Sequence, residues 1–203
     1  KNKLMKSDIT PFHWIIDFNE IIRSGGFDII LGNPPYFNLK GNDLLKNTKY
    51  YFDLKNGVLN SAAIFMSRSA DLLKKGGQLG MIIPKSFMYV ESWIKILELT
   101  LNNFELSSVV DVSKGFKDVL LEQIIVLGRK IHETDMSNQV KLIGKFGKDQ
   151  TENIVIQKQI IDDGVFIFND SYQKIWKRMN ENTTLLGDIS ENYRGIGAQK
   201  HSN

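Results

Sequence analysis

Residues 25–36 read Gly25-Gly26-Phe27-Asp28-Ile29-Ile30-Leu31-Gly32-Asn33-Pro34-Pro35-Tyr36. The almost unbroken apolar run over residues 27–31 predicts a strand that is buried on both faces of a parallel sheet. Ligands of open α/β sheets bind beyond the carboxyl ends of the strands. Residues 33–36 follow this strand directly. Their position therefore favours a functional segment over an ordinary Pro-Pro loop capped by a tyrosine.

The residue types in this tetrapeptide suit a planar amino group. The exocyclic amine of adenine is a poor nucleophile because its lone pair is delocalised into the ring. The side-chain oxygen of Asn33 and the main-chain carbonyl of Pro34 can each accept one of its two hydrogens, and the two prolines restrict φ. Carbonyl dipoles aimed at this nitrogen also stabilise the positive charge that it develops while it attacks a methyl group. Tyr36 can stack on the base, a contact worth roughly 1–3 kcal/mol.

Beyond the tetrapeptide, the pattern predicts alternating helices and strands. Residues 37–58 are polar and predict a long surface loop. Asn60 is a candidate helix N-cap, and apolar residues follow at helical spacing until Gly76 and Gly77. Strands are expected at residues 79–83 and 106–112, with a helix around residues 93–101 between them. This order predicts right-handed crossovers and a parallel sheet.

The later part of the chain predicts a β-rich extension. A strand at residues 120–127 is expected to be antiparallel, because the preceding connection is too short for a crossover helix. Shorter strands are expected at residues 140–143, 153–157 and 165–168, and a helix at residues 171–180.

Residues 25–36 closely resemble the catalytic motif of adenine-specific DNA methyltransferases, especially the large bacterial type IIG restriction-modification enzymes. The resemblance covers about residues 10–130. Residues 60–65 and 72–84 are similar to the helix, glycine turn and strand that follow the motif in that family. Residues 108–112 and 116–130 are similar to its last core strands, and residues 185–197 to the opening of its target-recognition domain.

This resemblance implies an α/β fold: half of a Rossmann-like S-adenosylmethionine-dependent methyltransferase sheet with a β-rich extension. It divides the chain into a catalytic half (residues 1–130), a β-rich extension with a linking helix (131–180) and the truncated start of a recognition domain (181–203). The implied function is site-specific methylation of a flipped adenine in double-stranded DNA, within a bacterial restriction-modification enzyme. The implied site residues are listed by role: catalytic Asn33, Pro34, Pro35 and Tyr36, and base-stacking Tyr36 and Phe116. For Phe116, ordinary core packing remains an equal alternative.

The donor site is expected to be incomplete. S-adenosylmethionine enzymes of this class use a glycine-rich turn after their first strand and an acidic residue after their second, and neither is recognisable here. The resemblance places this donor-binding half upstream of Lys1, so the chain alone is expected to be inactive. One departure is that residues 60–62 read Asn-Ser-Ala where many relatives have Asp-Leu-Tyr.

Composition adds weaker limits. The 203 residues carry a net charge of +3, which permits DNA binding without implying it. The absence of cysteine excludes disulfides and thiolate metal sites, and His13, His132 and His201 lack metal-ligand spacing. No apolar run approaches a membrane span and no secretory signal opens the chain, so we expect a cytoplasmic protein without a metal or membrane partner.

Two alternative functions remain open at this point. A protein glutamine-N5 methyltransferase is one, because a glutamine amide offers the same planar NH₂ group to the same acceptors. The other is a non-catalytic DNA-binding remnant. The recognition-domain-like terminus argues against the first alternative, and the intact residues 33–36 argue against the second.

Overall fold

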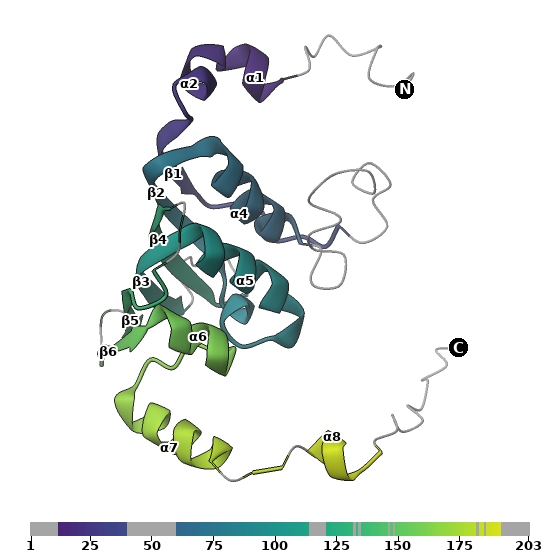
Figure 1. Cartoon of the computed structure of the whole chain (residues 1–203), viewed down its shortest axis with the longest axis vertical. Coiled ribbons are helices and arrows are strands. Elements are labelled where there is room, and N and C mark those ends of the chain that lie inside the picture. Colours follow the sequence, from purple (N-terminus) through teal and green to yellow (C-terminus); the bar gives the residue numbers. More distant parts are fainter. Residues whose placement is uncertain are drawn as a thin grey trace. The chain divides into compact units, whose positions relative to one another are not determined.

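The computed structural model describes residues 12–39, 60–113, 121–131, 133, 135–145, 147, 149–181, 183–184 and 186–191. The chain separates into two compact units, Lys1–Asn169 and Asp170–Asn203. Within the described residues, the first unit contains a six-stranded mixed sheet with helices (Figure 1). This architecture confirms the predicted α/β class. The predicted domain boundaries at residues 130 and 180 stay predictions.

The sheet has the strand order β1-β2-β4-β3-β5-β6. β1 pairs with β2 and β3 pairs with β5 in parallel, whereas β4 is antiparallel to both β2 and β3, and β6 is antiparallel to β5. The predicted antiparallel strand is thus confirmed as β4. The strands are β1 (Phe27–Gly32), β2 (Leu73–Pro84), β3 (Phe104–Ser113), β4 (Gln123–Lys130), β5 (Gln139–Gly144) and β6 (Thr151–Ile156).

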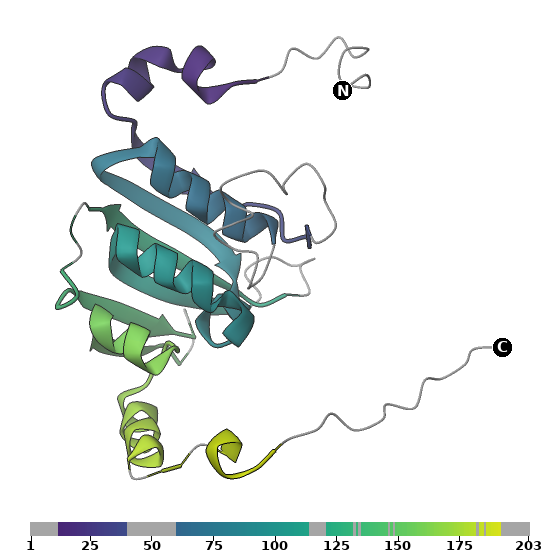
Figure 2. The ribbon, with the colours of Figure 1, turned by 45° about the vertical axis from the view of Figure 1, so that its right-hand side comes forward.

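Helices α4, α5 and α6 cover the same face of this sheet (Figure 2). α4 follows the predicted N-cap: the Ala62 amide donates to Asn60 Oδ1 at 2.9 Å. Every second residue of β2 from Leu79 to Ile83 is buried against these helices, together with Met66 of α4 and Leu97 of α5. The described helical elements of this unit are α1 (Trp14–Asp17), α2 (Asn19–Arg23), α4 (Ser61–Leu72), α5 (Ile94–Asn103), α6 (Gln157–Asp163) and the 3₁₀ turns η2 (Lys85–Met88) and η3 (Glu91–Trp93).

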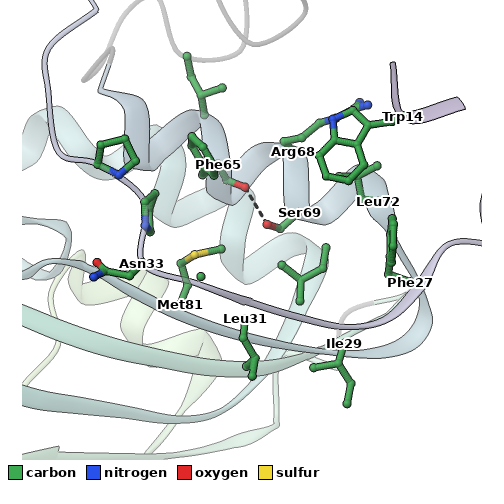
Figure 3. Close-up of a pocket in the computed structure, with 15 residues that line it drawn as sticks. Trp14, Phe27, Ile29, Leu31, Asn33, Phe65, Arg68, Ser69, Leu72 and Met81 are labelled. Atoms are coloured by element: carbon green, nitrogen blue, oxygen red, sulfur yellow. Dashed lines mark hydrogen bonds between the residues drawn. The ribbon is translucent and has the colours of Figure 1, made fainter. Parts of the chain in front are cut away.

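β1 forms one edge of the sheet, and this differs from the predicted burial on both faces. Ile29 is 60% and Leu31 is 77% exposed. Both side chains point away from α4 (Figure 3), toward the face that α4, α5 and α6 leave open. The prediction was wrong because an apolar run indicates a buried strand only where neighbours cover both of its faces. In the described part of the chain, α4, α5 and α6 lie over the opposite face and leave the face with Ile29 and Leu31 uncovered (Figure 2).

Two further predictions differ from the structure. Residues 165–168 are not a strand: Phe166 is buried in the core and its ring lies 5.9 Å from that of Phe87. Their apolar spacing reflects this packing and not strand pairing. Gln157 begins α6 and does not end a strand. The Gln157 side chain is fully buried and makes its hydrogen bonds from this position at the start of the helix.

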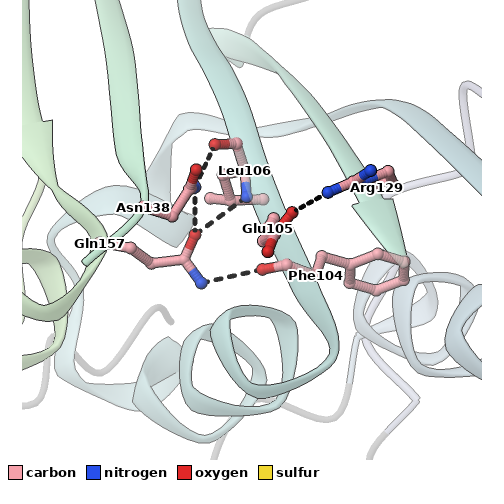
Figure 4. Close-up of polar contacts among 6 residues, drawn as sticks. All are labelled: Phe104, Glu105, Leu106, Arg129, Asn138 and Gln157. Atoms are coloured by element: carbon pink, nitrogen blue, oxygen red, sulfur yellow. Dashed lines mark hydrogen bonds and ion pairs between the residues drawn. The ribbon is translucent and has the colours of Figure 1, made fainter. Parts of the chain in front are cut away.

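Gln157 joins α6 to the junction between α5 and β3 (Figure 4). Its Nε2 donates to the carbonyls of Leu101 and Phe104 at 2.8 and 2.9 Å. Its Oε1 accepts from the Leu106 amide at 2.9 Å and from Asn138 Nδ2 at 3.2 Å. One amide side chain thereby satisfies backbone groups that would otherwise be buried without partners.

The second unit contains α7 (Asp170–Asn180) and α8 (Leu186–Ile189). α7 confirms the helix predicted at residues 171–180. It has no buried residue, and Tyr172, Ile175 and Met179 are exposed along it. Across the described residues of both units, no helix is long and apolar enough to span a bilayer.

We predict that Gln157→Ala lowers the free energy of unfolding of this chain by about 2–4 kcal/mol, because it leaves several buried backbone groups unpaired. Urea unfolding monitored by circular dichroism measures this change. Gln139→Ala, at an exposed position of β5, serves as the control and should change the value by less than about 0.5 kcal/mol. Equal effects of the two substitutions would contradict the structural role of Gln157.

Candidate active site at the carboxyl end of β1

The segment Asn33–Tyr36 leaves β1 beside the end of the parallel strand β2, where Gly32 lies opposite Met81. Pro34 is buried and Tyr36 is half-buried, while Asn33 and Pro35 are exposed. The structure therefore places all four predicted catalytic residues together, at the sheet edge where ligands of α/β proteins bind.

The hydroxyl of Tyr36 lies at the centre of a small polar cluster. It is 3.1 Å from Asn33 Oδ1 and 3.0 Å from the Ile82 carbonyl, and it accepts a hydrogen bond from Gln123 Nε2 at 3.4 Å. Burial raises the pKa of Tyr36 above its ordinary value, and the hydrogen bond from Gln123 opposes this shift. The hydroxyl is therefore protonated at neutral pH and acts as a donor. Its bond to Asn33 Oδ1 leaves that oxygen a second lone pair for another donor.

Tyr36 also packs against the hydrophobic core. The alternative interpretation from the sequence, a tyrosine that caps the core, therefore describes part of the role of Tyr36. The hydroxyl contacts show that the residue additionally touches the asparagine three positions before it.

Ser61, the first residue of α4, anchors the motif from the other side. Its buried hydroxyl donates to the Pro35 carbonyl and accepts from the Phe37 amide at 3.1 Å. The Ser61 amide donates in turn to the Phe37 carbonyl at 3.0 Å. Among the described residues, no donor reaches the Pro34 carbonyl. The Pro34 carbonyl can therefore accept a hydrogen bond from an amino-group ligand, whereas the Pro35 carbonyl already accepts one from Ser61.

Sequence reasoning predicted Asn60 as a helix N-cap and noted residues 60–62 as a departure from the family pattern, but it gave Ser61 no role. The structure assigns Asn60 to helix capping and Ser61 to holding the motif. The N-cap pattern itself predicted the first role. No local pattern could have predicted the second, because Ser61 and Pro35 are 26 positions apart.

Two pockets lined by described residues flank the motif. One has a volume of about 380 Å³ and is lined by Tyr36, by residues that follow β2 and by the chain before β4. The other, of about 530 Å³, is lined by Asn33, Pro34, Pro35, β1 and the side of α4 that carries Phe65 and Ser69 (Figure 3). The asparagine and the tyrosine of the motif therefore border different pockets. The side chains that line the first pocket are Tyr36, Asn60, Pro84, Lys85, Ser86, Tyr89, Trp93, Leu121 and Glu122.

Lys85 lies in the wall of the smaller pocket and is held by two carboxylates. Its Nζ is 2.9 Å from Asp111 Oδ2 and 2.8 Å from Glu122 Oε2. Burial lowers the pKa of Lys85, but the bonds to Glu122 and Asp111 outweigh this effect and hold the pKa above its ordinary value. The ammonium group therefore stays charged and ties the ends of β2, β3 and β4 together.

Some predicted features lie outside the described residues. Phe116 is one of them, so its stacking role stays a prediction. Among the described residues, no group of three or more histidine, aspartate or glutamate side chains is placed to hold a metal ion.

Comparison with known proteins identifies the family. The profile of the family described as Eco57I restriction-modification methylase matches residues 1–117. The chain belongs to this family. It is 30% identical over 214 aligned residues to a Methanocaldococcus jannaschii protein assigned as a type II restriction enzyme and methyltransferase, RM.MjaORFECS2P, and this alignment covers 95% of the chain. It is also 25% identical to RM.Eco57I of Escherichia coli, in an alignment that covers 80% of this chain. The chain spans only 17% of each of these relatives.

Solved structures show the same fold. The type IIG restriction endonuclease BpuSI matches with a TM-score of 0.52 and 14% identity, over 76% of this chain and 21% of that one. A Listeria monocytogenes protein assigned as a class I S-adenosylmethionine-dependent methyltransferase matches with a TM-score of 0.50 and 14% identity, over 61% of this chain and 38% of that one. The Rossmann-like methyltransferase fold predicted from the sequence is therefore confirmed, and this chain accounts for only part of it.

We predict that Ser61→Ala loosens the motif, because the Pro35 carbonyl and the Phe37 amide lose their side-chain partner. The expected cost is about 1–3 kcal/mol in unfolding free energy, together with faster hydrogen exchange of the Phe37 amide. Ser69→Ala is the matched control, since among the described residues the Ser69 hydroxyl bonds only to the Phe65 carbonyl of its own helix. Unchanged exchange at Phe37 in Ser61→Ala would show that Ser61 does not anchor the motif.

Proposed function

We propose that this chain carries the catalytic motif of an S-adenosylmethionine-dependent DNA methyltransferase that modifies adenine at N6, as part of a restriction-modification enzyme. One observation carries the proposal. At the carboxyl end of β1, the oxygen of Asn33 is oriented by the Tyr36 hydroxyl, and among the described residues the adjacent Pro34 carbonyl has no donor. Two acceptors in neighbouring residues match the two hydrogens of one planar amino group. Family membership supports the same class of reaction.

The proposed chemistry uses these groups without a strong base. Asn33 and Pro34 each accept one N6 hydrogen of adenine, which localises the nitrogen lone pair and stabilises its developing positive charge. The nitrogen attacks the methyl carbon as the carbon–sulfur bond of the donor breaks and releases a neutral thioether, and N6 then loses one proton to solvent. S-adenosylmethionine supplies an activated methyl group bound to a positively charged sulfur. The residues of this chain orient the acceptor nitrogen toward that methyl group.

The pocket beside Tyr36 is the proposed site for the ring of the target base, with its amino group directed past Tyr36 toward Asn33 and Pro34, which border the neighbouring pocket. An enzyme cannot reach N6 in this way inside a duplex, so the adenine must leave the base stack. The pocket volume of about 380 Å³ lies within the range of small-molecule sites. The ring of Tyr36 lines it and offers a stacking surface. Phe116 is proposed as a second stacking residue on the basis of the family resemblance.

We further propose that a donor-binding half pairs with β1. Among the described residues, one edge of the strand is unpaired, and its apolar side chains Ile29 and Leu31 are strongly exposed. An exposed apolar edge strand normally has a partner. The 530 Å³ pocket between β1 and α4 continues this apolar surface. The proposed division is a catalytic half at residues 1–130, a β-rich extension at 131–180 and the start of a DNA-recognition domain at 181–203.

In the complete polypeptide, Asn33→Ala should abolish adenine methylation and leave duplex affinity nearly unchanged, because phosphate contacts dominate DNA affinity. Nucleoside mass spectrometry of treated DNA measures N6-methyladenine, and fluorescence anisotropy measures binding. Asn19→Ala, an exposed asparagine of α2, is the control and should retain activity. Substantial N6 methylation by Asn33→Ala would remove this residue from the proposed mechanism. A methylated glutamine side chain instead of a methylated base would support the protein-modifying alternative.

The isolated chain should bind S-adenosylmethionine very weakly, because the donor site is proposed to belong mainly to a separate donor-binding half. Isothermal titration calorimetry of the 203-residue chain tests this, with RM.Eco57I titrated in the same buffer as the positive control. Micromolar affinity of the isolated chain would overturn the proposed division of the site.

A further inference from the structure

Gln123 is a buried amide side chain in contact with the candidate active site. It begins β4, where it lies opposite Pro84 of β2 and Ser113 of β3, and it is only 1% exposed. Its Nε2 donates to the Tyr36 hydroxyl at 3.4 Å, and its Oε1 is buried with no partner among the described residues. Burying an amide with so few hydrogen bonds costs free energy, so a residue of this kind at this position requires an explanation.

The explanation lies in the direction of the hydrogen bonds. A tyrosine hydroxyl has one proton to donate and lone pairs to accept with. Because Gln123 Nε2 can only donate, the proton of Tyr36 must point elsewhere, toward Asn33 Oδ1 at 3.1 Å or the Ile82 carbonyl at 3.0 Å. A donor at position 123 thus disfavours the reversed chain, in which Tyr36 donates to residue 123 and accepts from the Asn33 amino group.

The two directions have opposite consequences for the substrate. In the observed direction Asn33 presents an oxygen, which can accept a further hydrogen from an amino group. In the reversed direction the NH₂ group of Asn33 would face the substrate amino group. Both groups are hydrogen-bond donors, so no hydrogen bond could form between them.

We propose that Gln123 is a positioning residue for methyl transfer, which acts through the Tyr36 hydroxyl to keep the oxygen of Asn33 directed at the acceptor nitrogen. This inference rests on the proposed function, since it assigns Asn33 the task of binding the amino group. It adds a residue from β4 to a site otherwise built from β1 and α4.

The first test replaces the amide by an apolar side chain of similar length. Gln123→Met in the complete polypeptide should lower kcat by about three- to tenfold, the equivalent of one neutral hydrogen bond, with little change in KM for DNA. The effect should vanish in a Tyr36→Phe background, because the hydroxyl through which Gln123 acts is then absent. Wild-type kcat in Gln123→Met, or an equal loss in both backgrounds, would overturn the proposal.

The second test uses pH and also covers the possibility that Gln123→Met folds poorly. In Gln123→Glu, the protonated carboxyl group can donate to Tyr36, whereas the carboxylate cannot. Burial raises the pKa of such a carboxyl group, so the donor is present below that raised pKa and is lost as pH rises through it. The kcat of Gln123→Glu, relative to wild type, should therefore fall with rising pH to or below that of Gln123→Met, because the carboxylate accepts the Tyr36 proton and favours the reversed chain. A constant ratio to wild type across pH would contradict the positioning role.

A matched control separates positioning from general stability. Asn153 is another buried amide, 8% exposed, on β6 at the opposite edge of the sheet, and it donates to the Ile167 carbonyl at 2.9 Å. Asn153→Ala should lower the midpoint of urea unfolding without changing kcat of the folded enzyme or its pH dependence. A similar kcat loss in Asn153→Ala would attribute the effect of Gln123 to stability alone.

A readout without catalysis distinguishes failure of this inference from failure of the proposed function. NMR titration of ¹³C-labelled tyrosines in the 203-residue chain follows Tyr36, identified by its absence in Tyr36→Phe. Gln123→Met should raise the pKa of Tyr36, because the lost donor stabilises the phenolate. An unchanged pKa overturns the inference whatever the enzyme methylates. If the wild-type enzyme methylates a group other than adenine N6, the proposed function fails, and the kcat comparison is made on that group.

Discussion

The insertion of β4 between β2 and β3, antiparallel to both, is the constraint on which the site depends. The pairing places the start of β4 next to the ends of β2 and β3, with Gln123 opposite both Pro84 and Ser113. Gln123 thereby reaches Tyr36, a residue 87 positions earlier, and Glu122 reaches Lys85. Without this strand, the motif after β1 would have α4 as its main support.

The site combines rigid support with an open side. Ser61 and Gln123 hold the motif from α4 and β4, and each of them is almost fully buried. Asn33, by contrast, is exposed beside the edge of β1 that has no partner in the described part of the chain. Catalytic groups need to be fixed to within a fraction of an ångström, and a supporting layer of hydrogen bonds provides this. The exposed side of Asn33 is where the proposed donor-binding half would close the site.

Buried polar groups gather at one end of a sheet that is otherwise packed with apolar side chains. Lys85 and Asp111 form an ion pair there, close to Gln123 at the start of β4. Each such group costs desolvation free energy that an apolar residue would avoid. The Gln157 cluster at the junction of α5 and β3 shows a different use of a buried amide, since all of its contacts satisfy the backbone or a neighbouring amide. Gln123 is thus proposed to serve catalysis, whereas Gln157 serves folding.

Local patterns were sufficient to predict the strand before Asn33, the capped helix after Asn60 and the antiparallel β4, because caps, periodicity and connection length act over a few residues. They also placed Asn33 and Tyr36 together at the end of a strand. They were misleading at residues 27–31 and 165–168, where an apolar run does not reveal which faces have neighbours. The roles of Ser61, Gln123 and Gln157 emerged only from the folded chain. Each depends on hydrogen bonds between residues far apart in sequence, and strand order, which no local pattern encodes, brings those residues together.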